Sequence, residues 1–300
     1  METLKIGMVG LDTSHCVAFT RIFNDAAYEY HIPGARVVAA YGGGSALFAL
    51  SRERVKGYTE ELAGQYGIAL YEDIHELARD VDALLLESVD GRQHLEQFKA
   101  MAVGKPVFID KPLAVSTADA REILALAEET HTPIMSCSSL RYAAGIAGIV
   151  CQGEQVVCGE AFGPAPILED YPGLFWYGIH SAEILFSLMG AGCKQVRCIA
   201  HQDMDVAIGK WKDERLGVMR GTRFEKNEFG CVVHTDGGTR CGIAQSTPPY
   251  YFCLLQRVAA FFESGVSPVD TAETMDIIAF LEAADMSKAQ GGKVMRTEPL

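Results

Sequence analysis

The first part of the chain alternates short apolar runs with longer amphipathic segments. The apolar runs are of strand length and read LKIGMVG, ARVVAAYG, VDALLLES and KPVFID. The segments between and after them, in which apolar residues recur at helical spacing, cover residues 14–24, 51–66, 74–79, 92–103 and 117–130. This alternation is typical of parallel strands with helices on both faces. We therefore expect a doubly wound, Rossmann-type nucleotide-binding domain over residues 1–120.

Beyond Arg141 the pattern changes to long, glycine-containing strands with few helices between them. Examples are GEQVVCGEAFG, CKQVRCIAHQ and EFGCVVHTDGGTRCGIAQS. A final helix is expected over residues 270–288, because Asp270 can cap its start and Gly291-Gly292 follow its end. We expect a second, α+β domain with a large, mostly antiparallel sheet over residues 121–300. One face of that sheet lacks helical cover, which predicts burial in a homodimer or homotetramer.

The composition limits the classes of molecule that the protein is expected to bind. With 26 basic and 39 acidic residues the formal charge is −13, which disfavours binding to nucleic acid or anionic lipid. The start METLKIGMVG does not resemble a signal peptide, and no uncharged stretch reaches the ~18–20 apolar residues of a membrane span. We expect a cytoplasmic protein that binds a small molecule. Nine scattered cysteines without a C-x-x-C pair favour reduced thiols over disulfides or a zinc cage.

The loop after the first strand departs from a typical dinucleotide loop. Such loops need glycines for a tight turn and for close approach of the backbone to a pyrophosphate. The sequence GLDTSH provides Gly10, but Asp12 and His15 occupy the second and third glycine positions. Asp12 is unfavourable near a pyrophosphate unless it turns away, for example to cap the following helix. The alternative is that these are turn and capping residues of a domain that binds no nucleotide.

Two further stretches carry a family resemblance. ESVDGRQHLEQFKAMAVGKPVFIDKPLAVS contains His94, Gly104-Lys105 and Asp110-Lys111-Pro112, and GIHSAEILFSLMG contains His180 and Glu183. In this order they resemble the Gfo/Idh/MocA family of oxidoreductases, typified by glucose-fructose oxidoreductase and inositol dehydrogenases. Asp110 replaces the usual Glu of an E-K-P signature, and Glu183 replaces the usual Asp. The resemblance implies an NAD(P)-dependent oxidoreductase acting on a hydroxyl or carbonyl carbon of a sugar, cyclitol or related small polar molecule.

The chemistry of alcohol oxidation explains these residue types, because a base must take a proton while a cation stabilises the developing oxyanion. Lys111, at the end of a parallel strand, is suited to polarise the reacting oxygen, and His180 to exchange the proton. The expected catalytic residues are Lys111, His180 and Asp110. The expected cofactor-binding residues are Gly10, Asp12, Thr13, Ser14, His15, Gly42, Ser88, His94 and Lys111. The expected substrate-binding residues are Lys111, Arg141, Trp176, His180 and Glu183.

Several features leave alternatives open. Trp176 stands where family dehydrogenases commonly have a relay Asp, and Glu169 or Asp170 would have to compensate. Tyr41 and Gly42 stand where an acid would hold the ribose of NAD, and with Ser45, Arg52 and Arg54 downstream NADP is as plausible as NAD.

The same residues also have non-catalytic interpretations. Lys111 is alternatively a surface lysine, His180 a capping or buried histidine, and Glu183 a partner of the helix dipole. We expect no metal site, although His180 and Glu183 could bind one with His201, His234 or a cysteine. The functional alternatives are a ligand-binding or regulatory subunit without redox activity and a cofactor-independent lyase or isomerase.

Overall fold

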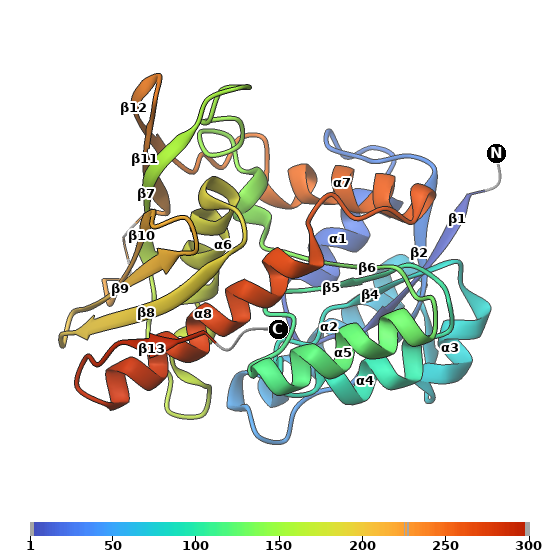
Figure 1. Ribbon diagram of the computed structural model, residues 1–300. Coiled ribbons are helices and arrows are strands. Elements are labelled where there is room, and N and C mark those ends of the chain that lie inside the picture. The colour runs from blue at the N-terminus through green and yellow to red at the C-terminus, as the bar shows by residue number, and fades with distance from the viewer. Residues whose placement is uncertain (1–2, 225, 227, 298–300) are drawn as a thin grey trace. The chain divides into compact units, whose positions relative to one another are not determined.

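The structure, a computed structural model, describes residues 3–224, 226 and 228–297. The chain forms two compact units (Figure 1). Unit 1 consists of Met1–Ala114, Ala118–Cys137 and Tyr251–Val269, and unit 2 of Val115–Thr117, Ser138–Tyr250 and Asp270–Leu300. Residues 121–137 and 251–269 thus belong to the first unit, although they lie beyond the boundary expected at residue 120. The chain leaves unit 1 and later returns to it.

Unit 1 is built on a six-stranded parallel sheet with the strand order β3-β2-β1-β4-β5-β6. Its strands are β1 (Leu4–Val9), β2 (Ala35–Tyr41), β3 (Ala69–Tyr71), β4 (Ala83–Leu86), β5 (Val107–Ile109) and β6 (Ile134–Ser136). All four residues of β4 are buried, as expected of a central strand covered on both faces. This confirms the doubly wound fold. The strand order reverses between β1 and β4, where ligands bind in sheets of this kind.

The helices of unit 1 cover both faces of its sheet. They are α1 (His15–Asn24), α2 (Ala49–Tyr66), α3 (Ile74–Asp80), α4 (His94–Met101), α5 (Thr117–Glu129, nearly all of it in this unit) and α7 (Tyr250–Ser264, from Tyr251 on). In Figure 1, α1 and α7 lie on one side of the strands and α4 and α5 on the other. Helix α7 was not predicted. Its Tyr251 ring contacts the Phe19 ring of α1, with 5.4 Å between the ring centroids.

Unit 2 contains a seven-stranded sheet with the order β12-β11-β7-β10-β9-β8-β13. Its elements are η1 (Ser139–Tyr142), β7 (Val156–Pro164), η2 (Gly173–Phe175), α6 (Gly178–Met189), β8 (Cys193–Ala200), β9 (Met204–Trp211), β10 (Leu216–Thr222), β11 (Gly230–Thr235), β12 (Gly238–Ile243), α8 (Thr271–Ala289) and β13 (Met295–Arg296). Every strand pair is antiparallel except β7 with β10. The predicted α+β architecture with a mostly antiparallel sheet is therefore confirmed.

The core of unit 2 lies between one face of this sheet and the helices α6 and α8. Trp211 is fully buried there, its ring 5.2 Å from that of Phe186, and its indole N–H donates to Gly190 O at 2.8 Å. A Cβ atom on Gly209 or Gly217 would lie within 2.8 Å of the Trp211 ring, so both positions require glycine. None of the described helices has the length and apolarity needed to span a membrane.

Candidate active site

The turn from β1 to α1 depends on Gly10. Gly10 has a φ of +88°, and a Cβ atom there would lie 2.2–2.5 Å from the side chain and backbone of Ser88. The loop is also tied to the end of β2, because Gly10 N–H donates to Tyr41 O at 3.0 Å and Leu11 N–H to Gly42 O at 2.7 Å. The one glycine retained in this loop is therefore the one that the backbone requires.

Asp12 turns away from the surface, but not to cap α1. Its carboxylate is fully buried and accepts hydrogen bonds from Ser51 Oγ at 2.6 Å and from Val89 N–H at 2.9 Å. Ser51 Oγ in turn accepts from Ser45 N–H, and Ser45 Oγ donates to Asp90 at 2.5 Å. Burial raises the pKa of Asp12 above its ordinary value. The carboxylate thus links the loops that follow three strands, β1, β2 and β4.

The expected cofactor residues on the loop after β4 are buried. His94 is fully buried, with Nε2 2.8 Å from Ser88 O and Nδ1 3.2 Å from Leu113 O, so its contribution to nucleotide binding would be indirect. Ser88 Oγ, Gln93 Oε1 and Gln97 Oε1 are buried without a hydrogen-bond partner among the described residues. Such orphaned polar atoms are uncommon and suit a polar ligand.

Asp90 and the residues after β2 bear on the choice of nucleotide. Burial opposes ionisation of Asp90, but hydrogen bonds from Arg92 and Ser45 hold its pKa below the ordinary value. The Ser45 hydroxyl is therefore already engaged. Arg52, which donates to Ala46 O at 2.6 Å, and Arg54 are exposed.

Four ionisable side chains meet at the carboxyl ends of β4 and β5 and the start of α1. His15 Nδ1 lies 3.2 Å from Asp110 Oδ2 and 3.4 Å from Glu87 Oε2, and Lys111 Nζ lies 3.3 Å from Asp110 Oδ2. Glu87 is fully buried, and the other three side chains are at most 13% exposed. The Lys111–Pro112 peptide bond is cis. The predicted residues His15, Asp110 and Lys111 are thus brought together in unit 1.

The pKa values in this cluster follow from burial and charge. Burial raises the pKa of Glu87 to about 7. Burial opposes protonation of His15, but the charge of Asp110 and the contacts with the Asp110 and Glu87 carboxylates together outweigh it and raise the His15 pKa to about 9. The charges of Lys111 and His15 hold the pKa of Asp110 below its ordinary value, although burial acts in the other direction. The two acids thus favour a protonated His15 imidazole, and burial favours a neutral Glu87 carboxyl.

His180 lies in the first turn of α6, in unit 2. Its Nδ1 is 2.7 Å from Ser138 Oγ, which fixes the orientation of the ring. The rings of Tyr177 and Phe229 each contact the imidazole edge to face, with centroids 5.4 Å away. The hydroxyl at Nδ1 and the two aromatic rings therefore fix how the imidazole is oriented.

Arg141 and Glu183 form a buried ion cluster with Glu273 of α8. Arg141 Nε lies 3.1 Å from Glu183 Oε2, and Arg141 Nη2 donates to Glu273 Oε1. Burial raises the pKa of Glu183 to about 7, and the negative charge of Glu273 adds to this effect. One guanidinium thus binds two carboxylates.

The metal site considered for His180 and Glu183 does not form among the described residues. In that part of the chain, the single group of side chains with spacing suited to a metal is His15, Glu87 and Asp110.

Trp176 precedes α6 and is half-buried. Its ring lies 5.4 Å from those of Tyr171 and Tyr177, which makes an aromatic surface next to His180. Because position 176 is a tryptophan, no carboxylate at this position can orient His180. The Ser138 hydroxyl orients the imidazole instead.

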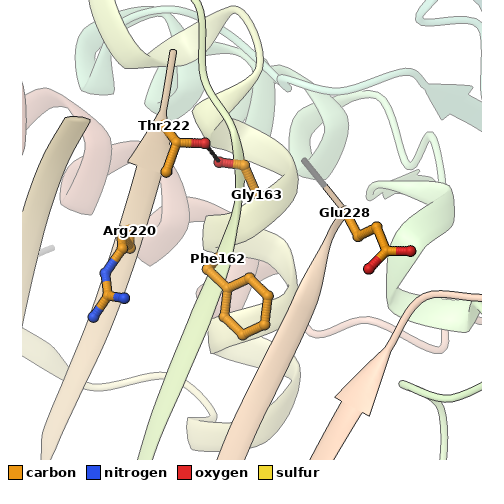
Figure 2. Close-up of a pocket in the computed structure, with 5 residues that line it drawn as sticks. All are labelled: Phe162, Gly163, Arg220, Thr222 and Glu228. Carbon is orange, nitrogen blue, oxygen red and sulfur yellow. Dashed lines mark hydrogen bonds between the residues drawn. The ribbon is translucent and has the colours of Figure 1, made fainter. Parts of the chain in front are cut away.

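A depression of about 270 Å³ lies elsewhere on unit 2, lined by residues of β7 and β10 and by Glu228, which precedes β11. Figure 2 shows it with Phe162 and Gly163 on one strand, Arg220 and Thr222 on the next, and Glu228 opposite. Thr222 Oγ1 donates to Gly163 O at 3.4 Å. Arg220 Nη2 is 2.8 Å from Glu160 Oε1, on a strand where alternate residues are buried. The depression shares no residue with the predicted site.

Comparison with known proteins fits this arrangement. Residues 5–137 match the family described as "Oxidoreductase family, NAD-binding Rossmann fold". Over these residues the chain is similar to the Gfo/Idh/MocA oxidoreductases, in agreement with the resemblance of its motifs. The match ends at Cys137, the last residue of the second segment of unit 1, and so contains Gly10, Asp12 and the cluster around Lys111. No curated protein sequence matches the chain significantly.

Solved structures resemble the whole chain. Apo scyllo-inositol dehydrogenase from Lactobacillus casei has a TM-score of 0.78 at 15% identity, covering 99% of this chain and 98% of that one. Myo-inositol dehydrogenase from Lactobacillus casei in complex with NAD(H) and myo-inositol has a TM-score of 0.76 at 14% identity, covering 100% and 98%. An oxidoreductase from Agrobacterium radiobacter with NAD+, L-tartaric acid and magnesium has 0.74 at 16%, covering 99% of each. At such identities the likeness establishes the fold.

Sequence reasoning missed several residues that the structure brings to these sites. Glu87 could have been found, because a carboxylate directly after the fully buried strand ALLL is an unusual position for a charge. Ser138 and Glu273 gave no such signal, since they lie 42 residues before His180 and 132 residues after Arg141. Their roles depend on tertiary packing.

Proposed function

We propose that the chain is an NAD(P)-dependent oxidoreductase that acts on a hydroxyl or carbonyl carbon of a sugar, cyclitol or related small polar molecule. The observation that carries the proposal is Lys111, directly after β5 in a domain of an NAD-binding oxidoreductase family. Inositol dehydrogenases among the structural neighbours support the substrate class.

The residues at the carboxyl edge of unit 1 fit a nucleotide in part. Gly10 gives the tight turn, and the inward orientation of Asp12 removes its charge from the path of a pyrophosphate. The orphaned oxygens of Gln93 and Gln97 offer acceptors nearby. Ribose recognition would differ from the usual pattern, because Ser45 is engaged by Asp90.

When bound, the nicotinamide supplies the acceptor or donor of hydride. The Lys111 ammonium would polarise the reacting oxygen, held in place by the adjacent Asp110 carboxylate. His180 would take or return the hydroxyl proton at Nε2, with Nδ1 held by Ser138. Trp176 would stack on the apolar face of a ring.

A second candidate is a family member without redox activity that binds a ligand or regulates a partner. The buried Asp12 network favours it, because the second glycine position now holds a carboxylate that links three loops. A third candidate, a cofactor-independent lyase or isomerase, would use Lys111 and His180 without a nucleotide.

Fluorescence titration of the purified protein with NADH and NADPH separates these functions. Saturation at micromolar nucleotide, followed by turnover in a screen of polyols and sugars, supports the oxidoreductase. Tight binding without turnover favours the binding or regulatory subunit. Turnover without nucleotide favours the lyase. Absence of binding up to millimolar nucleotide contradicts the leading proposal.

We also propose that unit 2 pairs with a second copy through the sheet face that α6 and α8 do not cover. Half-exposed apolar side chains on this face include Ile199 and Leu216, which are 50–52% exposed. The depression around Phe162 lies on the same sheet. Light scattering at micromolar concentration tests this, and a strictly monomeric mass would contradict it.

A further inference from the structure

The cluster at the carboxyl edge of unit 1 contains three side chains, of which the proposed hydride transfer uses only Asp110, to hold Lys111. His15 begins α1, Glu87 follows β4, and Asp110 follows β5. One atom of each, the imidazole Nδ1 and a carboxylate oxygen from each acid, lies within 4.8 Å of the other two. Because β1, β4 and β5 are neighbours in the sheet, their carboxyl ends bring the three residues together.

The distances have the values expected of ligands that share an ion. His15 Nδ1 is 3.2 Å from Asp110 Oδ2 and 3.4 Å from Glu87 Oε2. Two ligand atoms that are each ~2.1 Å from a metal subtend ~100–110° at it when they are separated by such distances. These angles are close to tetrahedral. The ligand oxygens of Glu87 and Asp110 are at most 4.8 Å apart. Two bonds of ~2.1 Å span at most ~4.2 Å, so these oxygens have to approach each other wherever their separation exceeds that value.

A second observation points to a ligand. Neither oxygen of Glu87 nor Nδ1 of His15 has an aligned hydrogen-bond partner among the described residues, and Glu87 is fully buried. A buried carboxylate without donors is costly unless a cation approaches it. The His15 ring is held between Phe19, stacked at 5.3 Å, and Tyr251, at 4.8 Å, which keeps Nδ1 toward the two acids.

We infer that His15, Glu87 and Asp110 bind a divalent first-row transition-metal cation. One imidazole nitrogen and two carboxylates suit Zn²⁺, Mn²⁺ or Fe²⁺ better than Mg²⁺ or Ca²⁺, which prefer oxygen ligands alone. A fourth position remains for water or a substrate oxygen. This departs from the expectation of no metal site. The inference concerns unit 1 alone and does not rest on the proposed redox function.

Without a metal, the same four side chains can balance their charges as two ion pairs. Lys111 Nζ is 3.3 Å from the Asp110 oxygen that also faces His15, so the ammonium and a protonated imidazole would neutralise the two acids. The test must separate this metal-free network from a metal site.

The experiment uses the full chain, freed of metal by a chelator and titrated with Mn²⁺ and with Co²⁺. Free Mn²⁺ is followed by electron paramagnetic resonance, and bound Co²⁺ by its visible spectrum. We expect one equivalent of either ion at micromolar affinity, and a Co²⁺ spectrum without thiolate charge transfer. Cys16 is not expected to contribute, because its thiol lies against Gly10 O and Thr13 O.

Two variants test whether the metal ion binds at His15, Glu87 and Asp110. Glu87→Gln keeps the shape and removes one ligand charge, and His15→Phe keeps the ring packing and removes the nitrogen. Each should weaken Mn²⁺ binding by about 100-fold, at least the loss seen when residues that support metal ligands are changed. The matched control is His201→Gln, at an exposed His–Asp pair with His201 Nδ1 3.6 Å from Asp203 Oδ2, which should bind as the unaltered protein does.

Three results would overturn the inference. One is substoichiometric binding of both ions to the unaltered protein, which would leave the cluster as a metal-free ion network. The second is equal affinity of both cluster variants and the control. The third is a thiolate band with Co²⁺, which would assign the ion to cysteines. Loss of folding in one variant does not prevent the test, because the other removes a different ligand.

Discussion

Two groups of buried charges, one in each unit, are built in opposite ways. In unit 1, Glu87 lies next to His15 and Asp110 without an aligned donor to either of its oxygens among the described residues. In unit 2, Glu183 is held by Arg141, which also binds Glu273. Burial alone does not distinguish them. The difference lies in whether the buried carboxylates have hydrogen-bond or ion-pair partners. A carboxylate without aligned donors is available to a ligand, whereas one bound by a guanidinium stabilises the fold.

The strongest test of this comparison is Arg141→Met. Removing the guanidinium leaves Glu183 and Glu273 buried without their cation, so the free energy of unfolding should fall by about 3–5 kcal/mol. Urea denaturation measures it. The double variant Arg141→Met with Glu183→Gln should recover part of the loss. A stable Arg141→Met protein with a raised KM would instead assign Arg141 to the substrate, as the sequence predicted.

Lys111→Met should act on turnover rather than on folding. Without the ammonium the reacting oxygen loses its polarising cation, and kcat should fall by about 100-fold or more, equivalent to about 2.7 kcal/mol. NADH binding should stay within a few-fold. The matched control is Lys99→Met, which removes a lysine paired on the surface with Glu96 and Glu122. Unchanged kcat in the Lys111 variant would remove this residue from the mechanism.

The pH dependence of stability tests Glu183. Its pKa is raised to about 7 from the model-compound value of 4.5, so the native state keeps a proton that the unfolded chain releases. The native state therefore binds more protons between these values, and the free energy of unfolding should decrease by about 1–3 kcal/mol as pH rises from about 4.5 to 7. Glu183→Gln should flatten this slope, as shown by urea denaturation at several pH values. An unchanged slope would mean that Arg141 keeps Glu183 ionised throughout.

The smallest effect is expected for Asp12→Asn. The amide keeps the shape, and its Oδ1 can still accept from Val89 N–H, while the buried charge is lost. If the charge already faces inward, affinity for NADH should change by less than ~3-fold by fluorescence titration, well under the ~1.4 kcal/mol of a tenfold change. A tenfold gain would show that Asp12 repels the pyrophosphate after all. Asp12→Gly is less informative, because it also removes the links to Ser51 and Val89.

The sequence predicted most of the fold because its periodicities are local. Four strands of unit 1 (β1, β2, β4 and β5), its first five helices and the final helix all follow from apolar spacing and end signals near their observed bounds. Helix α7 was missed, since its residues were considered only as part of an uncharged stretch around Pro248-Pro249. Its place in unit 1 depends on contacts such as Tyr251 with Phe19, which no local pattern reports.

The candidate site was predicted less completely than the fold. Motif resemblance identified Lys111, Asp110 and His180, and the structure adds their neighbours. Sequence reasoning treated Asp12 and His15 as departures from a glycine loop that could still bind the cofactor, with Asp12 as a possible helix cap. In the structure Asp12 accepts hydrogen bonds from Ser51 and Val89, and His15 lies next to Asp110. These partners lie far away in the sequence. Departures from a motif could be located, but what compensates for them depends on tertiary contacts.

The return of α7 to the first unit has a consequence for synthesis. Unit 1 cannot be completed until residue 269 has emerged from the ribosome, although its sheet is finished at Ser136. At translation rates of ~5–20 residues per second, the nascent β-sheet would wait on the order of 10 s for the helix that packs on α1. During that interval Phe19 and the His15 ring lack the aromatic cover of Tyr251. Nascent chains stalled before residue 250 should therefore be open to chaperones at this face.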